Sequence, residues 1–216
     1  MKVDIYSDIA CPWCYIGHAR FERALERFDG ADRIEVRYRP YQLDPGAPAR
    51  AEPMLGYLAR RFGGQARAMA DRVITIARGE GIEMDYERGL AVNTLNAHRL
   101  LALAERERGV ATQRALVARL FAAHFSQGRD VGDPHTLAEL AAEDGMDAAT
   151  VEAYLESDTG ATEVREEIAA ARRLGVQAVP TYLLDDRYVI EGAQPVELFH
   201  HGFEVMAGDA ARPATA

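Results

Sequence analysis

Hydrophobic and polar positions alternate in two different ways over the first forty residues. Residues 2–6 (KVDIY) have the period of a half-exposed or edge strand, and residues 34–39 (IEVRYR) repeat it before Pro40. Between them the spacing becomes helical, which predicts a helix that begins close to Pro12 and ends near Gly30. This spacing is carried by Phe21, Ala24, Leu25 and Phe28. The order predicts a strand–helix–strand unit.

From about Met54 to Ser157 the patterns are helical, and no segment reads as a strand. Two apolar stripes are formed by Ala97, Leu100, Leu101 and Ala104, and by Val117, Leu120, Phe121 and His124. Asp133 before Pro134 is a helix start, with a side-chain acceptor before a proline at the first helical position, and Asp147 is a second candidate cap. We therefore expect an all-helical block.

Strand patterns return at the end of the chain. A helix with Val164, Ile168, Ala171 and Leu174 on one side ends at Gly175. Residues 181–184 and 188–190 then flank a predicted turn at 185–187, and residues 195–206 form a closing helix. The whole order predicts an α/β protein with a thioredoxin-like fold, βαβ followed by ββα, split by a large all-helical insertion.

The domain boundaries follow from these elements. The thioredoxin-like domain is assigned to 1–48 and 160–208, the inserted helical domain to 49–159, and a loose C-terminal tail to 209–216.

Composition and charge exclude some classes of function and indicate where the protein works. The chain has 216 residues, 48% of them hydrophobic, and a net charge of −9, which argues against a nucleic-acid partner. Acidic residues interrupt the first ten positions, so we expect no secretory signal, and no apolar run is long enough to span a membrane. A cytoplasmic protein is expected. Structural disulfides are rare there, so its two cysteines are expected to serve catalysis or metal binding.

The two cysteines lie in the segment Cys11-Pro12-Trp13-Cys14, at the predicted helix start. Disulfide exchange needs a thiolate that is exposed to substrate and a second thiol one turn away that resolves the mixed disulfide. The helix dipole and unpaired N–H groups favour an anion at Cys11, and Pro12 suits the first helical position. Cys14 is expected to lie deeper in the helix, and Trp13 to cover the two sulfurs or contact substrate.

Val179-Pro180 precedes the predicted strand at 181–184. Proline cannot donate to a sheet ladder, so its place at the strand entry suggests a cis peptide bond. In a thioredoxin fold this loop faces the active-site cysteines, where Val179 and Pro180 would present backbone groups to a bound peptide or thiol.

Five segments in order resemble the FrnE-like branch of the DsbA family, which is close to 2-hydroxychromene-2-carboxylate isomerases and kappa-class glutathione transferases. They are Cys11-Pro12-Trp13-Cys14-Tyr15-Ile16-Gly17, Tyr41-Gln42-Leu43-Asp44-Pro45, Asn93-Thr94-x-x-Ala97-His98-Arg99-Leu100, Gly175-Val176-x-x-Val179-Pro180-Thr181 and Gly192-Ala193-Gln194-Pro195. The resemblance implies a thioredoxin domain with a helical insertion, catalytic Cys11 and Cys14, and a cis Pro180. It also brings His98 to the substrate groove as a candidate.

Several alternatives stay open. Zinc could use Cys11, Cys14 and His18, but a structural site needs four ligands and no further cysteine exists, so no metal is expected. His124 is more simply a core histidine. As the leading hypothesis, the chain is a thiol–disulfide oxidoreductase whose partner is a thiol- or disulfide-containing protein or small molecule. The second hypothesis is a glutathione-dependent isomerase or transferase, with glutathione as co-substrate. No tightly bound cofactor is expected. A binding module without turnover is the third, and a homodimer through the helical block is open.

Overall fold

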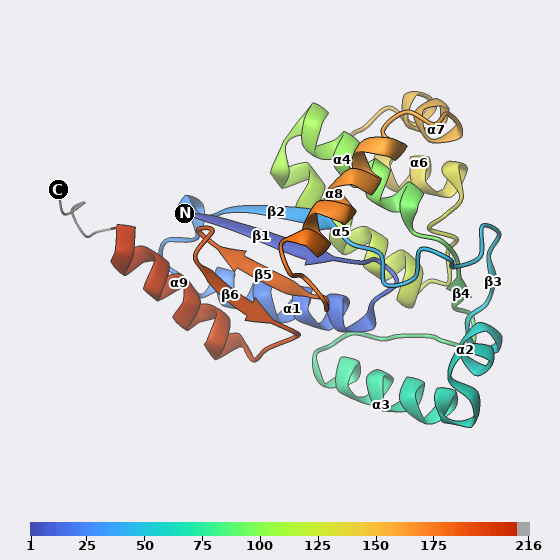
Figure 1. Ribbon diagram of the computed structural model, residues 1–216, viewed down its shortest axis with the longest axis horizontal. Helices are drawn as coiled ribbons and strands as arrows, with labels where there is room; N and C mark the ends of the chain where they lie inside the picture. The colour runs from blue at the N-terminus through green and yellow to red at the C-terminus, as the bar shows by residue number, and fades with distance from the viewer. Residues whose placement is uncertain (211–216) are drawn as a thin grey trace.

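The computed structural model describes residues 1–210, which form a central four-stranded sheet surrounded by helices (Figure 1). The strand order is β2 (Glu35–Pro40), β1 (Lys2–Ser7), β5 (Thr181–Leu184), β6 (Tyr188–Glu191). β1 runs parallel to β2 and antiparallel to β5, and β5 pairs antiparallel with β6. This sheet, with helices inserted between β2 and β5, confirms the predicted fold class.

β1 is an interior strand, so the expectation of a half-exposed or edge strand is wrong. The alternation of polar and apolar residues in this strand suggested one exposed face, but the polar residue Asp4 is buried. The Asp4 carboxylate binds Arg39 at 2.8 Å and Lys2 at 2.9 Å. A buried charge that is paired in this way is tolerated inside a sheet.

Two helices pack together on one face of the sheet, α1 (Pro12–Glu26) and α9 (Val196–Ala210) (Figure 1). Phe21 of α1 stacks on Tyr182 of β5 and meets Phe203 of α9 edge-on. α1 ends at Glu26, before the expected Gly30. α9 continues past residue 206, so residues 209 and 210 of the predicted tail are helical; residues 211–216 lie outside the described residues.

The inserted region is mostly helical. Its α-helices are α2 (Met54–Phe62), α3 (Ala66–Gly79), α4 (Leu95–Arg108), α5 (Val110–Phe125), α6 (Pro134–Glu143) and α7 (Ala148–Glu156). A 3₁₀ turn at Gly63–Gln65 also lies in it, and another, at Ala31–Arg33, precedes β2. One expectation fails here, because β3 (Glu52–Pro53) pairs with β4 (Leu90–Ala91) in a small second sheet. Segments of two residues are too short to leave a periodic pattern.

Helix α8 (Ala161–Arg173) returns the chain to the sheet and packs on β2 and α4. Val164, Ile168 and Ala171 are buried as expected, but Leu174 is exposed. The predicted hairpin between β5 and β6 is confirmed, with Asp185 and Asp186 at φ 48° and 56°. Aspartate is among the few residues that adopt this left-handed region readily.

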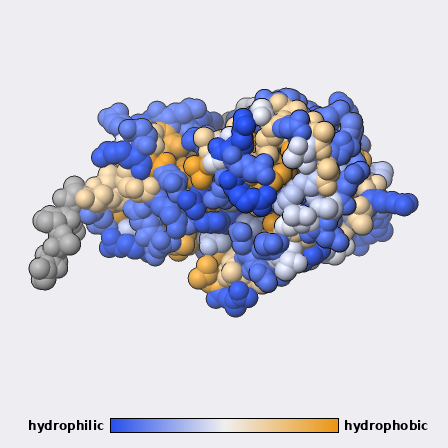
Figure 2. Space-filling view, turned by 90° about the horizontal axis from the view of Figure 1, so that it is seen from above, coloured by the Kyte–Doolittle hydropathy of each residue, from blue (hydrophilic) through white to orange (hydrophobic). Residues whose placement is uncertain are grey.

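The face of the molecule in Figure 2 is mostly hydrophilic, and its hydrophobic residues show in small separate groups. Within residues 1–210, no helix combines the length and apolar character that crossing a membrane requires.

Candidate active site

The two cysteines lie at the N-terminus of α1. Cys11 is the N-cap residue, with extended backbone, and Pro12 is the first helical residue, as expected. The Cys14 backbone N–H donates to the Cys11 carbonyl at 3.0 Å, which closes the first turn between them. Both are free thiols, and each is only 2% exposed. The expectation that the Cys11 side chain is exposed is therefore wrong for this structure, since it is as buried as Cys14.

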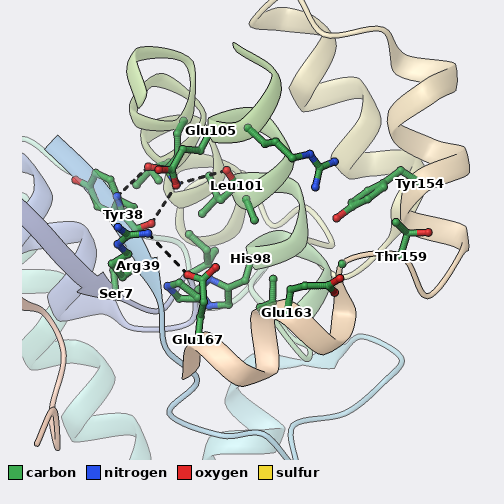
Figure 3. Close-up of a pocket in the computed structure, with 18 residues that line it drawn as sticks. Ser7, Tyr38, Arg39, His98, Leu101, Glu105, Tyr154, Thr159, Glu163 and Glu167 are labelled. Carbon is green, nitrogen blue, oxygen red and sulfur yellow. Dashed lines mark hydrogen bonds and ion pairs between the residues drawn. The ribbon is translucent and has the colours of Figure 1, made fainter. Parts of the chain in front are cut away.

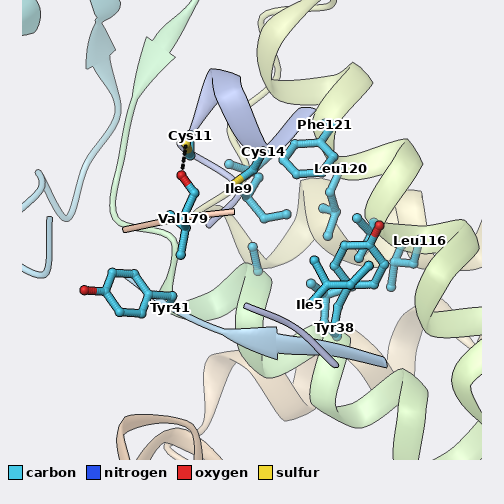
Figure 4. Close-up of a cluster of buried hydrophobic side chains, with 14 of the residues drawn as sticks. Ile5, Ile9, Cys11, Cys14, Tyr38, Tyr41, Leu116, Leu120, Phe121 and Val179 are labelled. Carbon is cyan, nitrogen blue, oxygen red and sulfur yellow. Dashed lines mark hydrogen bonds between the residues drawn. The ribbon is translucent and has the colours of Figure 1, made fainter. Parts of the chain in front are cut away.

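The loop before β5 covers Cys11. The Val179–Pro180 bond is cis, as the sequence suggested, and the Cys11 thiol donates to the Val179 carbonyl at 3.6 Å (Figure 4). Helix α1 approaches this loop closely at Gly17, where a Cβ atom would lie 3.0 Å from Pro180 and 2.5 Å from the Tyr182 hydroxyl. A side chain here would collide with both groups, so glycine at this position lets α1 pack directly against Pro180 and Tyr182.

Cys14 points into the interior, toward the cluster that contains Ile9 and Phe121 (Figure 4). Burial raises the pKa of the Cys14 thiol well above its usual value, and the neighbouring Cys11 sulfur adds to the increase. A buried thiol of this kind stays protonated near neutral pH. Cys14 therefore suits the second, internal step of an exchange.

An apolar pocket of about 350 Å³ opens beside the cysteine segment. Pro12 and Trp13 form part of its wall, and the Trp13 side chain is 39% exposed. Three further exposed hydrophobic side chains line it: Leu43, Phe62 and Met69. Arg61, at its wall, is paired with Asp44. Exposed hydrophobic groups gathered at one hollow indicate a binding surface, and here it adjoins the thiols.

Asp8, three residues before Cys11, is a buried carboxylate that the sequence analysis missed. It accepts hydrogen bonds from the Leu43 N–H and the Thr94 hydroxyl, both at 2.8 Å. Burial disfavours its charge, but His98 and these two donors outweigh that effect and lower the Asp8 pKa. Two features of the sequence could have indicated this site: an acidic residue close to the cysteine segment, and the occurrence of Thr94 and His98 in one motif.

The histidines take separate places. His98 is 3% exposed, its Nε2 lies 3.4 Å from an Asp8 oxygen, and it lines a different cavity from the apolar pocket. His124 is buried in the wall of the apolar pocket, and burial lowers its pKa to about 4. His18 Nδ1 lies 2.6 Å from the Tyr38 hydroxyl. Among residues 1–210 no three His, Cys, Asp or Glu side chains are grouped as a metal site.

The site thus brings together Cys11, Cys14, Pro12, Trp13, Val179 and Pro180, while His98 reaches it through Asp8. A thiol at a helix start, facing a cis-proline loop, with a second thiol one turn away, can carry out thiol–disulfide exchange.

Known proteins resemble this chain in sequence and fold. A probable DsbA oxidoreductase from Streptomyces coelicolor is 37% identical, covers 100% of this chain and 93% of its own, and superposes with a TM-score of 0.88. The cytosolic disulfide reductase DsbM from Pseudomonas aeruginosa, solved with GSH, is 20% identical over 96% of this chain and 100% of that one, with a TM-score of 0.67.

A 2-hydroxychromene-2-carboxylate isomerase is 20% identical over 98% of each chain, with a TM-score of 0.69. At 20% identity, this structure and the reductase show the fold alone. Residues 2–204 match the family model described as the DSBA-like thioredoxin domain. From this match and the 37% identity, we conclude that the chain belongs to the DSBA-like thioredoxin domain family.

Proposed function

We propose that this chain is a thiol–disulfide oxidoreductase in which Cys11 exchanges with the substrate and Cys14 resolves the mixed disulfide. The observation that carries the proposal is the position of Cys11 at the start of α1, with its sulfur against the Val179 carbonyl and Cys14 one turn further on.

In the reducing direction, the Cys11 thiolate attacks one sulfur of the substrate disulfide, and the other substrate sulfur leaves as a thiolate that takes a proton. Cys14 loses its proton, and its sulfur attacks Cys11 to form the Cys11–Cys14 disulfide. The second substrate sulfur then leaves and is protonated. The substrate gains two electrons and two protons, and the two cysteines lose them; oxidation of a substrate dithiol is the same sequence reversed.

We assign substrate binding to the two surfaces that flank Cys11. The carbonyl of Val179 beside Pro180 can accept a hydrogen bond from a peptide or thiol once the Cys11 thiol ionises and stops donating to it. Pro12, Trp13 and the apolar pocket would hold a hydrophobic part of the substrate. His98 supports the site from behind, through Asp8.

Single replacements of each cysteine test the mechanism. Cys11→Ser should abolish disulfide exchange, whereas Cys14→Ser should accumulate a mixed disulfide with the substrate, detected by mass under non-reducing conditions. Exchange at the normal rate by Cys11→Ser would refute the assignment. The control is the circular dichroism spectrum of each variant, which should match that of the parent and so show that the fold is intact.

The reduction potential decides the direction. Equilibration of the protein in glutathione redox buffers with thiol quantification should give a reversible two-electron couple. A value near about −120 mV would mark an oxidant and one near about −270 mV a reductant. We propose a reductant acting in the cytoplasm, since a structural neighbour of the same fold is a cytosolic disulfide reductase.

A glutathione-dependent isomerase or transferase is the second candidate, favoured by the small apolar pocket and the isomerase of the same fold. Turnover of a small aromatic substrate that persists in Cys14→Ser and requires glutathione would support it. If calorimetry detects no glutathione binding, this second candidate function is ruled out. Against it, Arg61, the one guanidinium among the described residues of the pocket wall, is already paired with Asp44 and is not free for a carboxylate of glutathione.

A further inference from the structure

The wall of the apolar pocket contains an imidazole that has no hydrogen-bond partner, that of His124 on α5. This side chain is only 1% exposed, and neither ring nitrogen bonds to any residue of 1–210. A neutral imidazole offers one N–H donor and one nitrogen acceptor. Each buried polar atom without a partner costs about 1–3 kcal/mol, so an unpaired imidazole in the wall of a pocket indicates a ligand group that completes it.

The charged side chains of the pocket wall are already engaged. Asp8 accepts a hydrogen bond from the Thr94 hydroxyl at 2.8 Å, and Asp44 is ion-paired with Arg61. His124, in contrast, is free to bind a polar part of a ligand. An anionic group beside His124 would be repelled by the Asp8 carboxylate, so a neutral polar group suits this position best.

A second buried histidine, His98, shows what a partner changes. It lines a separate cavity of about 420 Å³ (Figure 3), and its Nε2 lies 3.4 Å from an Asp8 oxygen. Asp8 also acts on His124, but only through its charge: burial lowers the His124 pKa to about 4, and Asp8 opposes that effect. Asp8 therefore pairs with His98 and leaves His124 neutral, without a hydrogen bond.

Aromatic side chains form much of the remaining wall of the apolar pocket. They are Trp13, Tyr57, Phe62, Tyr86 and Phe125. The His124 ring meets the Phe125 ring edge-on, with 4.6 Å between the two centroids. An aromatic ligand gains about 0.5–1.5 kcal/mol per ring pair beyond the burial of its surface. The pocket, of about 350 Å³, therefore suits a flat apolar ring that carries one neutral polar group.

We propose that the apolar pocket binds a hydroxyphenyl group of the substrate, with a hydrogen bond between its hydroxyl and the imidazole of His124. The inference rests on the proposed thiol–disulfide exchange, because Trp13 lines the pocket and lies between Cys11 and Cys14 in the chain. A phenol both donates and accepts, so it can pair with either ring nitrogen. A tyrosine beside a peptide cysteine and a small phenolic thiol present the same group. His124 selects the substrate and takes no part in the exchange itself.

Two pairs of symmetrical disulfides test this proposal on the full-length, reduced protein. One pair is formed from the dipeptide amides Cys-Tyr and Cys-Phe, the other from 4-hydroxyphenylethanethiol and phenylethanethiol. The rate constant for oxidation of the protein is measured by acid quench and thiol quantification, and divided by that for dithiothreitol to remove intrinsic reactivity. The hydroxyl should raise this ratio about three- to tenfold, which corresponds to one hydrogen bond. A preference in the dipeptide pair alone identifies a peptide substrate, and one in the other pair alone a small thiol.

Replacement of the histidine locates the recognition. His124→Leu should bring the two members of each pair to equal rates, whereas His201→Leu, at an exposed position of α9 outside the pocket, should keep the preference of the parent. The inference is overturned if the parent shows no preference in either pair, a result that does not depend on the folding of a variant, or if His124→Leu keeps the preference. Exchange with all four disulfides at matched rates would leave the proposed function standing, and failure to react with any of them would overturn that function as well.

Discussion

At the scale of single residues, burial controls the protonation of Cys14, in the first turn of α1, and of His124, in the wall of the apolar pocket. Burial keeps the Cys14 thiol protonated, because its pKa is raised well above the usual value. Burial also keeps His124 neutral, because its pKa is lowered to about 4. Cys14 and His124 therefore add no charge to the site at neutral pH, which suits the apolar pocket beside the cysteines.

His124 should make the protein less stable in mild acid. An unfolded histidine takes up a proton below its usual pKa of 6.5, but the folded His124 does so only near 4. Stability that is present above pH 6.5 is thus lost as the pH falls toward 4, by about 2 kcal/mol between pH 7 and pH 5. His124→Leu should remove most of this loss in urea unfolding at the two pH values.

His201→Leu is the control for that measurement, since His201 is exposed and should leave the pH dependence unchanged. His18, whose pKa burial also lowers, contributes a further loss in both variants. Equal losses in the parent and His124→Leu would contradict the assignment to His124.

At the scale of elements, one buried arginine links α4 to the end of α7 through hydrogen bonds. Arg99 of α4 donates hydrogen bonds to carbonyl groups at the end of α7 and in the loop that follows. They are the carbonyls of Tyr154 at 2.8 Å, Leu155 at 3.0 Å, Ser157 at 2.6 Å and Thr159 at 2.8 Å. The last carbonyls of a helix have no partner within it, so Arg99 satisfies groups that would otherwise be unpaired.

Arg99→Met should lower the free energy of unfolding by about 2–4 kcal/mol, because several buried carbonyls lose their donor at once. Hydrogen exchange should show faster exchange in residues 154–161, with little change in the central sheet. Arg106→Met removes an exposed guanidinium that packs on the same Tyr154 ring, and it should cost less than about 1 kcal/mol. Equal effects of the two variants would show that the carbonyl bonds do not hold the loop.

Local signals were read correctly from the sequence. Asp133 and Asp147 begin α6 and α7, and each accepts the N–H expected of a cap. The helix start at Pro12 and the cis bond before Pro180 also depend on nearby residues, so the sequence is sufficient for them.

Features that depend on distant partners were missed. β1 looked half-exposed because the residues that cover it, in β5, come near the other end of the chain. The burial of Cys11 depends on Val179, and the place of Asp8 depends on Thr94. No local pattern contains such a contact.

At the scale of the whole molecule, Asp8 joins the sheet to the inserted region. Its carboxylate, at the end of β1, accepts from the Leu43 N–H and from Thr94 at the start of α4. Asp8→Asn replaces one acceptor with a donor that faces other donors, and should lower the free energy of unfolding by about 2–4 kcal/mol in urea at pH 7.

Hydrogen exchange at the Leu43 amide should also accelerate in Asp8→Asn. The exposed Asp158→Asn makes the same chemical change, and should stay within about 0.5 kcal/mol of the parent. A stable Asp8→Asn protein with a protected Leu43 amide would mean that Asp8 does not join these regions.

The interior position of β1 has a consequence for folding during synthesis on the ribosome. β1 is synthesised long before β5, one of its two neighbours, which spans Thr181–Leu184. Nearly the whole helical region must emerge before the sheet can close, and closure across so long a stretch of chain is slow. During that interval β1 has an open edge, of the kind that joins with other chains. The cysteines at residues 11 and 14 are thus synthesised long before the loop that faces them, at Val179.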